Sequence, residues 1–455
     1  MRHTNRTARI LALAAASTFV LAACGDDGGS GNAGGTASEK PDAEEVQSAC
    51  DSFESAPPPE AGTKIEPPPG VSKSDGVLTI GSVLPRTGNL AFLGPPEFAG
   101  LELAVKEINE AGGVLGKPVQ YIEGDSGDAQ QDVANPTVDR LLAAGADVLI
   151  GAASSGVTKT FLDKAVSGGA VVYSPANTSP DFTTIDDKGL YFRTAPSDVL
   201  QGRVLGETIV ADGHENVAIL SLQDPYGEGL SLNAGRAICA GGSNVVTETV
   251  FYDPASPNFD AQVGEVKSAD PDAIILIGFD ESAKIIQAMV GQQIGPQEVP
   301  VYLVDGNLGN ALGEDLPAGV LEGTKGTLPG AQATEDFRTR LLEIDPALKD
   351  YSYSGETYDA VVTSALAAVV AKSDAGDKIA LALPDVTRGG EKCDSFATCL
   401  ELANAGTDLD YDGVSGPIEL SDVGDPTKAT IGVYSYGPDN KLTDQIDFVE
   451  GSLTD

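Results

Sequence analysis

The sequence predicts an α/β protein made of two doubly wound parallel-sheet lobes, joined by a hinge that the chain crosses more than once. Short apolar runs alternate with amphipathic helical patterns from residue 77 onward, and this alternation is typical of parallel sheets covered by helices. The alternation restarts at residue 216, which indicates a second unit of similar size. A later helical pattern at 355–372 is expected to pack back on the first lobe, and this return requires a further crossing.

Composition allows two domain cores and argues against nucleic-acid binding. The chain has 455 residues, of which 41% are hydrophobic, so each lobe can bury a core. The formal net charge is −40, whereas binding a phosphate backbone requires clustered Lys and Arg. No long basic run occurs after the first ten residues. The acidity therefore indicates a soluble surface or a salty, extracellular setting.

The N-terminus has the pattern of an export signal. Arg2, Arg6 and Arg9 precede an apolar run at 10–23 that is too short for a permanent membrane span. The run ends in Leu-Ala-Ala before Cys24, which resembles the lipobox of bacterial lipoproteins. This resemblance implies cleavage after residue 23, lipid attachment to Cys24, and anchoring on the extracytoplasmic face of the cell membrane. The alternative is an ordinary signal peptide with a chance cysteine.

Residues 24–76 are interpreted as a lipidated, flexible tether, because the range is rich in Gly, Ser, Asp and Pro. It contains a short helical pattern at 44–53. Four cysteines remain after cleavage, and an even number in an exported chain indicates two disulfides. Three pairings are open. The short separation favours Cys393–Cys399, which leaves Cys50–Cys239 to tie the N-terminal segment to a helix of the body.

The first unit is expected to alternate strands and helices. Its helix at 97–110 carries apolar residues at helical spacing on one face and stops at a Gly-Gly pair. Strands are expected at 77–83, 119–123, 148–151, 170–173 and, as a crossing strand, at 191–194; the other helices are expected at 131–144 and from residue 159.

The second unit continues the alternation without an alignable sequence repeat. Strands are expected at 216–222, 244–251, 273–277 and 301–304, and helices at 200–211, 229–240, 260–267, 282–291, 333–342 and 355–372. The tail at 411–449 has turns typical of a β-meander. The predicted division is 77–195 for the first lobe, 196–328 for the second, 329–429 for the return to the first, and 430–455 for the return to the second and the C-terminal tail.

Two Ser/Thr-rich turns follow consecutive apolar strands, at 152–158 and at 174–180. The first turn opens a helix, whose free N–H groups suit a carboxylate together with the hydroxyls. Helix capping alone explains one such turn. Two of them in consecutive strand–helix units indicate a ligand cleft at the carboxyl ends of parallel strands.

Sequence motifs of enzymes and metal sites are absent. His3, which signal cleavage removes, and His214 are the two histidines, so a Ser–His–acid triad has a single candidate base. The chain has no Gly-x-Ser-x-Gly elbow, phosphate-binding loop or dinucleotide fingerprint, and its Cys and His spacings do not match a zinc site. Asp125 and Asp128 are interpreted as a solvated turn rather than a calcium site. We therefore expect a protein that is not an enzyme and holds no metal or cofactor.

Several short segments are specific in their order and spacing, although no single one is decisive. They are Gly-Ser-Val-Leu-Pro-Arg-Thr-Gly-Asn-Leu-Ala-Phe-Leu-Gly at 81–94, Ile-Asn-Glu-Ala-Gly-Gly at 108–113, the two Ser/Thr-rich turns, Phe-Arg-Thr at 192–194, and the segments 224–229, 356–360 and 412–416. Together they resemble the leucine/isoleucine/valine-binding family of solute-binding proteins, whose type I periplasmic fold serves ABC importers. The resemblance covers nearly all of 77–450.

The resemblance implies a site for an amino acid between the lobes. It assigns the α-carboxylate to Ser155, to the backbone of Ala176 and to Thr178, which are the groups that the two turns indicate independently. Ser154 is a neighbour of lower rank. Both charges of a zwitterion lose water when the cleft closes, so each must find a partner in the protein.

The remaining contacts are also implied by the resemblance. Phe92 or Leu93 is expected to contact the ligand side chain from the first lobe, and Tyr226 and Phe279 from the second. Asp305 is the candidate partner of the α-ammonium group; the competing interpretation is an ordinary helix cap.

The resemblance further implies a function. It is the capture of an amino acid, of the branched-chain type or a close relative, by a monomer that passes it to an ABC permease and its ATPase. The alternatives are a binding protein for urea, an amide or a small carboxylate, and a ligand sensor that acts through a membrane partner.

Overall fold

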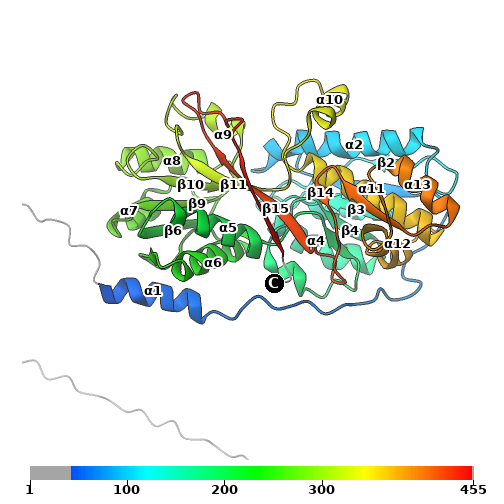
Figure 1. Ribbon diagram of the computed structural model, residues 1–455, viewed down its shortest axis with the longest axis horizontal. Helices are drawn as coiled ribbons and strands as arrows, with labels where there is room; N and C mark the ends of the chain where they lie inside the picture. Colours follow the sequence, from blue (N-terminus) through cyan, green and yellow to red (C-terminus); the bar gives the residue numbers. More distant parts are fainter. Residues whose placement is uncertain (1–42, 453–455) are drawn as a thin grey trace, which may run out of the picture. The chain divides into compact units, whose positions relative to one another are not determined.

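The computed structural model describes residues 43–452, with side chains from Ala49 onward, and it contains two large, separate α/β sheets and one small three-stranded sheet (Figure 1). The predicted fold class is confirmed, because each large sheet is built mainly from parallel strands that alternate with helices. The predicted signal peptide and the lipidation site Cys24 lie outside the described residues.

The first sheet has five parallel strands in the order β2-β1-β3-β4-β5. They are β1 (Thr79–Val83), β2 (Gln120–Ile122), β3 (Val148–Gly151), β4 (Val171–Ser174) and β5 (Tyr191–Arg193). Every residue of β1, β3, β4 and β5 is buried, as expected for strands covered on both faces. Because β3 pairs with β4, the two Ser/Thr-rich turns that follow these strands are neighbours.

Helices from distant parts of the chain cover this sheet. They are α2 (Gly94–Glu110), α3 (Ala134–Ala143), α4 (Ser155–Ser167), α11 (Ser354–Ala371), α12 (Gly376–Ala382) and α13 (Phe396–Ala405). Helix α11 is buried without a break from its first residue to Ala368, because its small Ala, Val, Ser and Thr side chains allow close packing on α2 and the sheet. The predicted return of the chain to the first lobe is thus found in α11.

The second sheet has the order β16-β15-β11-β10-β9-β6-β7, and β8 also pairs with β6. Its strands are β6 (Asn216–Leu222), β7 (Asn244–Val245), β8 (Val250–Tyr252), β9 (Ala273–Ile277), β10 (Val301–Val304), β11 (Lys325–Pro329), β15 (Lys428–Ser435) and β16 (Asp447–Ser452). The strands up to β11 are parallel, whereas β15 and β16 add antiparallel pairs at one edge. Its helices are α5 (Asp198–Ala211), α6 (Pro225–Ala240), α7 (Asp260–Ser268), α8 (Ser282–Gly291) and α9 (Asn310–Glu314).

Three connections within residues 77–452 join the two sheets. Residues 194–197 lead from β5 to α5, residues 330–334 lead from β11 to α10 (Glu335–Ile344), which packs on α2, and residues 418–427 lead to β15. These connections form the multi-crossing hinge that the sequence predicts.

Three sequence-based assignments differ from the structure. The expected crossing strand at 191–194 is β5, an edge strand of the first sheet. The expected strand at 244–251 is two short strands, β7 and β8, because only its ends pair with β6. The expected β-meander is divided: β13 (Leu409–Gly413) and β14 (Gly416–Pro417) pair with each other, whereas β15 and β16 belong to the second sheet. The hinge connection at 418–427 separates the two pairs.

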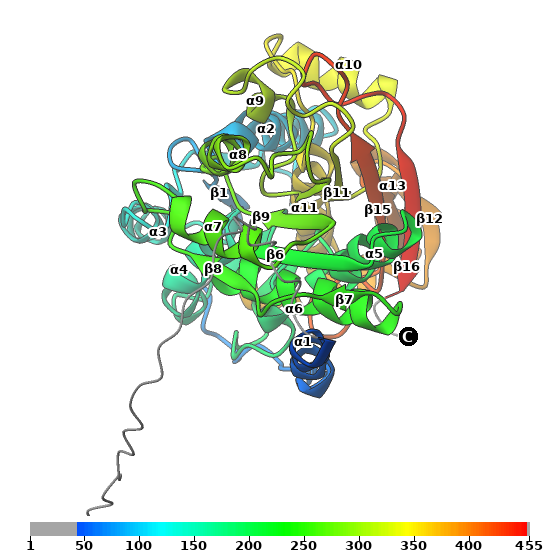
Figure 2. The ribbon, with the colours of Figure 1, turned by 90° about the vertical axis from the view of Figure 1, so that its left-hand side faces the viewer.

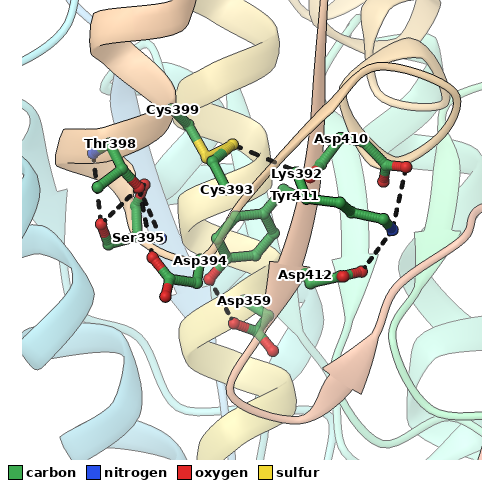
Figure 3. The surroundings of a disulfide bond; sticks show 10 residues. All are labelled: Asp359, Lys392, Cys393, Asp394, Ser395, Thr398, Cys399, Asp410, Tyr411 and Asp412. Carbon is green, nitrogen blue, oxygen red and sulfur yellow. Dashed lines mark hydrogen bonds and ion pairs between the residues drawn. A yellow bond between two sulfur atoms is a disulfide. The ribbon is translucent and has the colours of Figure 1, made fainter.

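A disulfide joins Cys393 to Cys399, with a Cα–Cα distance of 5.3 Å. It links β12 (Glu391–Cys393) to α13, beside the ring of Tyr411 (Figure 3). The Tyr411 hydroxyl donates a hydrogen bond of 2.7 Å to the buried carboxylate of Asp359 on α11. The disulfide therefore closes a local loop against the core of the first lobe and does not connect the lobes.

The N-terminal arm differs from the flexible tether expected at 24–76. Its described part begins with α1 (Ala43–Ser55), whose Cys50 forms a disulfide with Cys239 of α6. Figure 2 shows α1 beside α6 and β7, in agreement with their contacts. Phe53 is buried in the core of the second lobe. The described arm is thus fixed to the second lobe at one end, and the Cys50–Cys239 pair is the one that the cysteine count leaves after Cys393–Cys399. Composition alone does not reveal the buried ring of Phe53. No helix within residues 43–452 is long and apolar enough to span a membrane.

Replacing Asp147 by Asn is expected to reduce the loss of stability at high pH. Burial raises the pKa of Asp147 to about 8, while the N–H of Thr79 donates a 2.8 Å hydrogen bond to its carboxylate. The native state therefore holds a proton that an unfolded Asp, with a pKa of about 3.9, has already released. The retained proton therefore adds to the free energy of unfolding below pH 4, and this stabilisation is lost as the pH rises toward 8.

Urea unfolding at pH 5 and pH 9 measures this effect. The difference in the free energy of unfolding between the two values should be smaller in Asp147→Asn than in the wild type. Asp163→Asn, at an exposed surface position, should leave it unchanged. Equal differences in all three proteins would show that Asp147 does not hold this proton.

Candidate functional site

The first Ser/Thr-rich turn lies between β3 and α4. Ser154 is the N-cap of α4, and its hydroxyl accepts a 3.2 Å hydrogen bond from the N–H of Val157. Ser155 is the first residue of the helix and is buried. Its hydroxyl oxygen accepts a 3.3 Å hydrogen bond from the N–H of Ser179 in the second turn. Each of these hydroxyls accepts one hydrogen bond and can still donate its proton. That of Ser154 caps the helix, whereas that of Ser155 lies against the second turn.

The second turn is held against the first by side-chain hydrogen bonds. Ser174 donates to the carbonyl of Ala152 at 2.7 Å, and the amide of Asn177 donates to the same carbonyl at 2.9 Å. Ala176 and Thr178 are buried in this turn. The Thr178 hydroxyl has no hydrogen-bond partner. A buried hydroxyl without a partner is costly, so its presence is expected where a ligand completes it.

Arg193 fastens the second turn to the hinge. The side chain is fully buried, and its Nε donates a 2.7 Å hydrogen bond to Asp425 in the connection that leads to β15. Its Nη1 donates to the carbonyls of Asn177 and Ser179, at 3.3 and 2.8 Å, and its Nη2 donates to Thr183. The guanidinium charge is thus paired with Asp425, and the remaining N–H donors of Arg193 order the turn.

Asp305 directly follows β10 and is the centre of a buried hydrogen-bond network. Its carboxylate accepts hydrogen bonds from the hydroxyl of Tyr226 at 2.7 Å, the amide of Gln201 at 2.8 Å and the hydroxyl of Tyr353 at 2.8 Å. Burial raises the pKa of Asp305, and these three donors oppose the rise. Asp305 is not a helix cap, because Gly309 is the N-cap of α9. The network holds the carboxylate in one orientation.

Asp198, Gln201 and Tyr353 belong to this site and were missed by the sequence reasoning. Asp198 is the first residue of α5 and is fully buried, and neither of its carboxylate oxygens has a hydrogen-bond partner. Its backbone N–H donates a 2.7 Å hydrogen bond to the carbonyl of Thr178, so it lies beside the second turn. In the sequence Asp198 follows a Pro-Ser pair and has the pattern of an ordinary helix start.

Burial raises the pKa of Asp198 well above its ordinary value, and the negative charge of Asp305 raises it further. The Thr178 hydroxyl lies close enough to oppose this rise, without the geometry of a hydrogen bond. Tyr353 has a φ of 59°, in the left-handed region, immediately before α11. Such a backbone is uncommon for a bulky residue and is often found at functional positions.

The apolar residues expected to contact the ligand come from both lobes, and the cavity that two of them line includes none of Ser155, Thr178, Asp198 and Asp305. The rings of Tyr226 and Phe279 stack with centroids 5.7 Å apart. Phe92 and Phe279 line a cavity of about 200 Å³. Leu93 and Ala176 pack into the same buried apolar cluster as Tyr226. Phe92 thus faces a cavity, whereas Leu93 is a packing residue between the lobes.

Backbone contact across the cleft shows that the lobes touch each other. The N–H of Asp280 in the second lobe donates a 3.3 Å hydrogen bond to the carbonyl of Asn89 in the first. Between the lobes, hydroxyl and N–H donors at the turns lie beside the acids Asp198 and Asp305. This arrangement can pair both charges of a small zwitterion, since a carboxylate takes the donors and an ammonium group takes an acid.

Other candidate chemistry finds little support in the geometry. Asp125 accepts hydrogen bonds from the N–H groups of Arg86, Thr87 and Gly127, so it orders its own turn. Within residues 49–452 no group of three or more His, Cys, Asp or Glu side chains is placed to hold a metal ion. His214 lies beside Asp272 and Tyr302 in the second lobe, away from both turns.

Comparison with known proteins gives one family and a consistent set of relatives. The sequence model of a family described as periplasmic binding protein matches residues 77–429. BasB, the substrate-binding protein of a chemotactic signal transduction system in Halobacterium salinarum, is 26% identical over 361 residues, which are 76% of this chain and 83% of BasB. Leu/Ile/Val-binding protein homolog 1 of Brucella suis is 27% identical over 324 residues, which are 68% of this chain and 82% of the relative.

A solved structure shares the fold. It is the branched-chain amino acid transporter substrate-binding protein LivJ from Streptococcus pneumoniae, in complex with isoleucine. The TM-score is 0.66 at 20% identity, and the match covers 82% of this chain and 100% of LivJ.

Proposed function

The chain belongs to the periplasmic binding protein family, and on this premise we propose that it captures an amino acid of the branched-chain type, or a close relative, and delivers it to an ABC permease and its ATPase. Family membership implies an extracytoplasmic location and a small-molecule ligand. The finer proposal includes a monomer anchored to the membrane by a lipid on Cys24. Relatives whose names specify Leu, Ile and Val support the choice of ligand class.

One observation carries the proposal: unpaired hydrogen-bonding groups of opposite character are buried together. The Thr178 hydroxyl and both oxygens of Asp198 have no partner, and they belong to neighbouring segments. Asp305 adds a second acid that is already oriented by three donors. The proposed ligand pairs its α-carboxylate with Ser155, Thr178 and the backbone of Ala176, whose N–H donates a 3.2 Å hydrogen bond to the Ser174 hydroxyl in the structure. Its α-ammonium pairs with Asp198 and Asp305. Phe92, Tyr226 and Phe279 are the proposed contacts of its side chain.

A thermal-shift screen of the full chain against amino acids, amides and small carboxylates tests the function. A ligand at a hundred times its dissociation constant stabilises the protein by about 2.7 kcal/mol, which shifts the melting temperature measurably. A shift with α-amino acids is expected. If only plain carboxylates shift the melting temperature, the acids do not bind an ammonium group of the ligand. If only urea or amides do so, the ligand is not a zwitterion.

The double variant Ser155→Ala/Thr178→Val is expected to weaken binding of the ligand found in that screen. Each lost hydrogen bond to a charged group costs about 1.5–3 kcal/mol, so the loss of two should raise the dissociation constant by about a hundredfold or more. Thr160→Val, at an exposed position on the same helix, is the matched control. It removes a hydroxyl that donates to the carbonyl of Val157, and no change in affinity is expected. Calorimetric titration distinguishes the two; an unchanged affinity in the double variant would refute the site.

A ligand sensor is the second candidate function. It is favoured by the similarity to BasB, whose name places it in a chemotactic signal transduction system. Both roles use the same cleft and the same ligand chemistry. They differ in the membrane partner that retains the ligand-loaded protein: a permease for import, or a receptor for signalling.

A further inference from the structure

The N-terminal arm is attached to both lobes. At one end, α1 is bound to α6 of the second lobe through the disulfide Cys50–Cys239, whose Cα atoms are 5.7 Å apart. The ring of Phe53 lies so close to Gly235 of α6 that a Cβ atom there would be 2.4 Å from it. Arg236 donates a 2.8 Å hydrogen bond to the carbonyl of Ala56, where the helix has ended. The attachment to the second lobe is therefore both covalent and closely packed.

The other end of the arm is bound to the first lobe. The N–H of Gly70 donates to Asp377 of α12 at 3.2 Å, and the N–H of Asp377 donates to the hydroxyl of Ser72 at 3.0 Å. Asp374 accepts hydrogen bonds from the N–H groups of Asp75 and Gly76, at 2.9 and 2.8 Å. These acceptors belong to the first lobe, because α12 packs on α11 and β4.

The segment between the two attachments has little freedom to extend. It contains three prolines at 57–59 and three at 67–69 and forms neither helix nor strand. Proline fixes φ, so such segments behave as semi-rigid spacers. The segment also lies closely on the first lobe: a Cβ atom at Gly189 would be 2.2 Å from the carbonyl oxygen of Ile65, and one at Gly62 would be 2.1 Å from that of Thr183. In Figure 1 this blue segment runs from α1 toward α12.

We propose that residues 49–76 form a strap that restricts opening of the cleft. In the structure, the strap joins the two lobes while Asp280 reaches Asn89 across the cleft, and it passes the hinge connection at Val423, which a Cβ atom at Gly62 would approach to 2.8 Å. Opening that lengthens the path between its two attachments must detach the strap from the first lobe, because the disulfide prevents its release from the second. The strap therefore raises the free energy of the open state relative to the closed state, and a ligand that binds the closed state is held more tightly. This regulation of affinity rests on the proposed function, whereas the restriction of opening does not.

Two variants of the full chain release the strap in different ways. Cys50→Ser/Cys239→Ser frees its end on the second lobe. A ten-residue Gly/Ser insertion after Pro59 gives it slack but keeps both attachments. The controls are Cys393→Ser/Cys399→Ser, which removes the disulfide within the first lobe, and the same insertion after Ser38, upstream of the strap. The insertion after Pro59 also keeps the test valid if loss of Cys50–Cys239 impairs folding.

Hydrogen–deuterium exchange without ligand is the first readout. The informative peptides cover 86–93 and 278–284, which meet across the cleft and are not part of the strap. They should exchange faster in both strap variants, and their exchange rate should be unchanged in both controls. The second readout is ligand affinity, which should fall about three- to tenfold in the strap variants through faster dissociation.

The two readouts separate failure of the strap from failure of the proposed function. Unchanged exchange in the insertion variant would overturn the strap, even if the cysteine variant exchanges faster, because the effect would then be a local loosening of the second lobe. Faster exchange in a protein that binds no amino acid would support the strap and refute the proposed ligand.

Discussion

Replacing Arg193 by Met is expected to lower the free energy of unfolding by about 3–5 kcal/mol. The substitution leaves the carboxylate of Asp425 buried without its positive partner, and breaking a buried ion pair from one side carries a cost of this size. It also removes the hydrogen bonds to the carbonyls of Asn177 and Ser179, which lie in the turn that presents Thr178. Ligand affinity should therefore decrease together with stability. Urea unfolding and calorimetric titration measure the two effects.

Two further variants show whether the loss comes from the unpaired charge. Arg193→Met/Asp425→Leu removes both charges and should recover a large part of the stability, because an apolar pair of similar volume is often as stable as a buried ion pair. Lys159→Met breaks the ion pair with the exposed Asp181 and should cost less than about 1 kcal/mol. A loss below 1 kcal/mol in Arg193→Met itself would show that the buried pair does not hold the hinge to the turn.

Asp198→Asn is expected to weaken binding of an α-amino acid by about 2–5 kcal/mol, which corresponds to about thirtyfold or more in the dissociation constant. The reason is that neither oxygen of this acid has a hydrogen-bond partner in the structure. Binding of a ligand that has the carboxylate but lacks the ammonium group should not weaken. The variant therefore changes the preference between the two ligand classes, which calorimetric titration of both ligands measures.

We also expect ligand binding to depend on pH through Asp198. Burial and the charge of Asp305 raise the pKa of Asp198 well above its ordinary value, so the empty site keeps a proton there to a higher pH than an ordinary Asp does. An incoming ammonium group favours the ionised carboxylate, and binding then releases the proton. Affinity for an α-amino acid should increase as the pH rises toward the pKa of Asp198 in the empty site. In Asp198→Asn this slope should diminish, whereas Asp181→Asn, at an exposed position nearby, should retain it.

A steeper or unchanged slope in Asp198→Asn would assign the proton to another group. Asp305 is then the first candidate, because burial also raises its pKa. The companion variant Asp305→Asn should lose the slope in that case. It keeps one oxygen that can accept from Tyr226 and Gln201, which share one oxygen of Asp305, so its effect on the network is smaller than that of an alanine.

Much of the fold could be predicted from local sequence patterns. Alternating apolar runs and amphipathic helices specify strands and helices one at a time, and each pattern depends only on residues that are close in the chain. The two Ser/Thr-rich turns, with Ser155 and Thr178, could be recognised in the same way, because both groups lie just after apolar strands. Boundaries moved by a few residues, as with α2, which begins at Gly94 rather than at residue 97.

The acid network could not be predicted in this way. Gln201, Tyr226, Asp305 and Tyr353 lie on separate elements, and their hydrogen bonds span 48 to 104 residues of sequence. Asp198 has the pattern of a helix start, and its lack of a partner is a property of the folded environment alone. The arm gave a mixed signal: its Pro-rich composition matches a tether, whereas the cysteine count indicated the Cys50–Cys239 disulfide, and nothing local indicated that Phe53 is buried in the second lobe.

The sequence by itself determined the α/β class, the order of the elements, the two turns and the acidic, exported character of the chain, because these follow from periodicity, composition and short motifs. Only the tertiary structure decided which acids stay buried without a partner, which arginine holds the second turn to the hinge, and which segments join the lobes. Those properties depend on the loss of water around charges and on contacts between residues far apart in the chain, and neither is encoded in any local pattern.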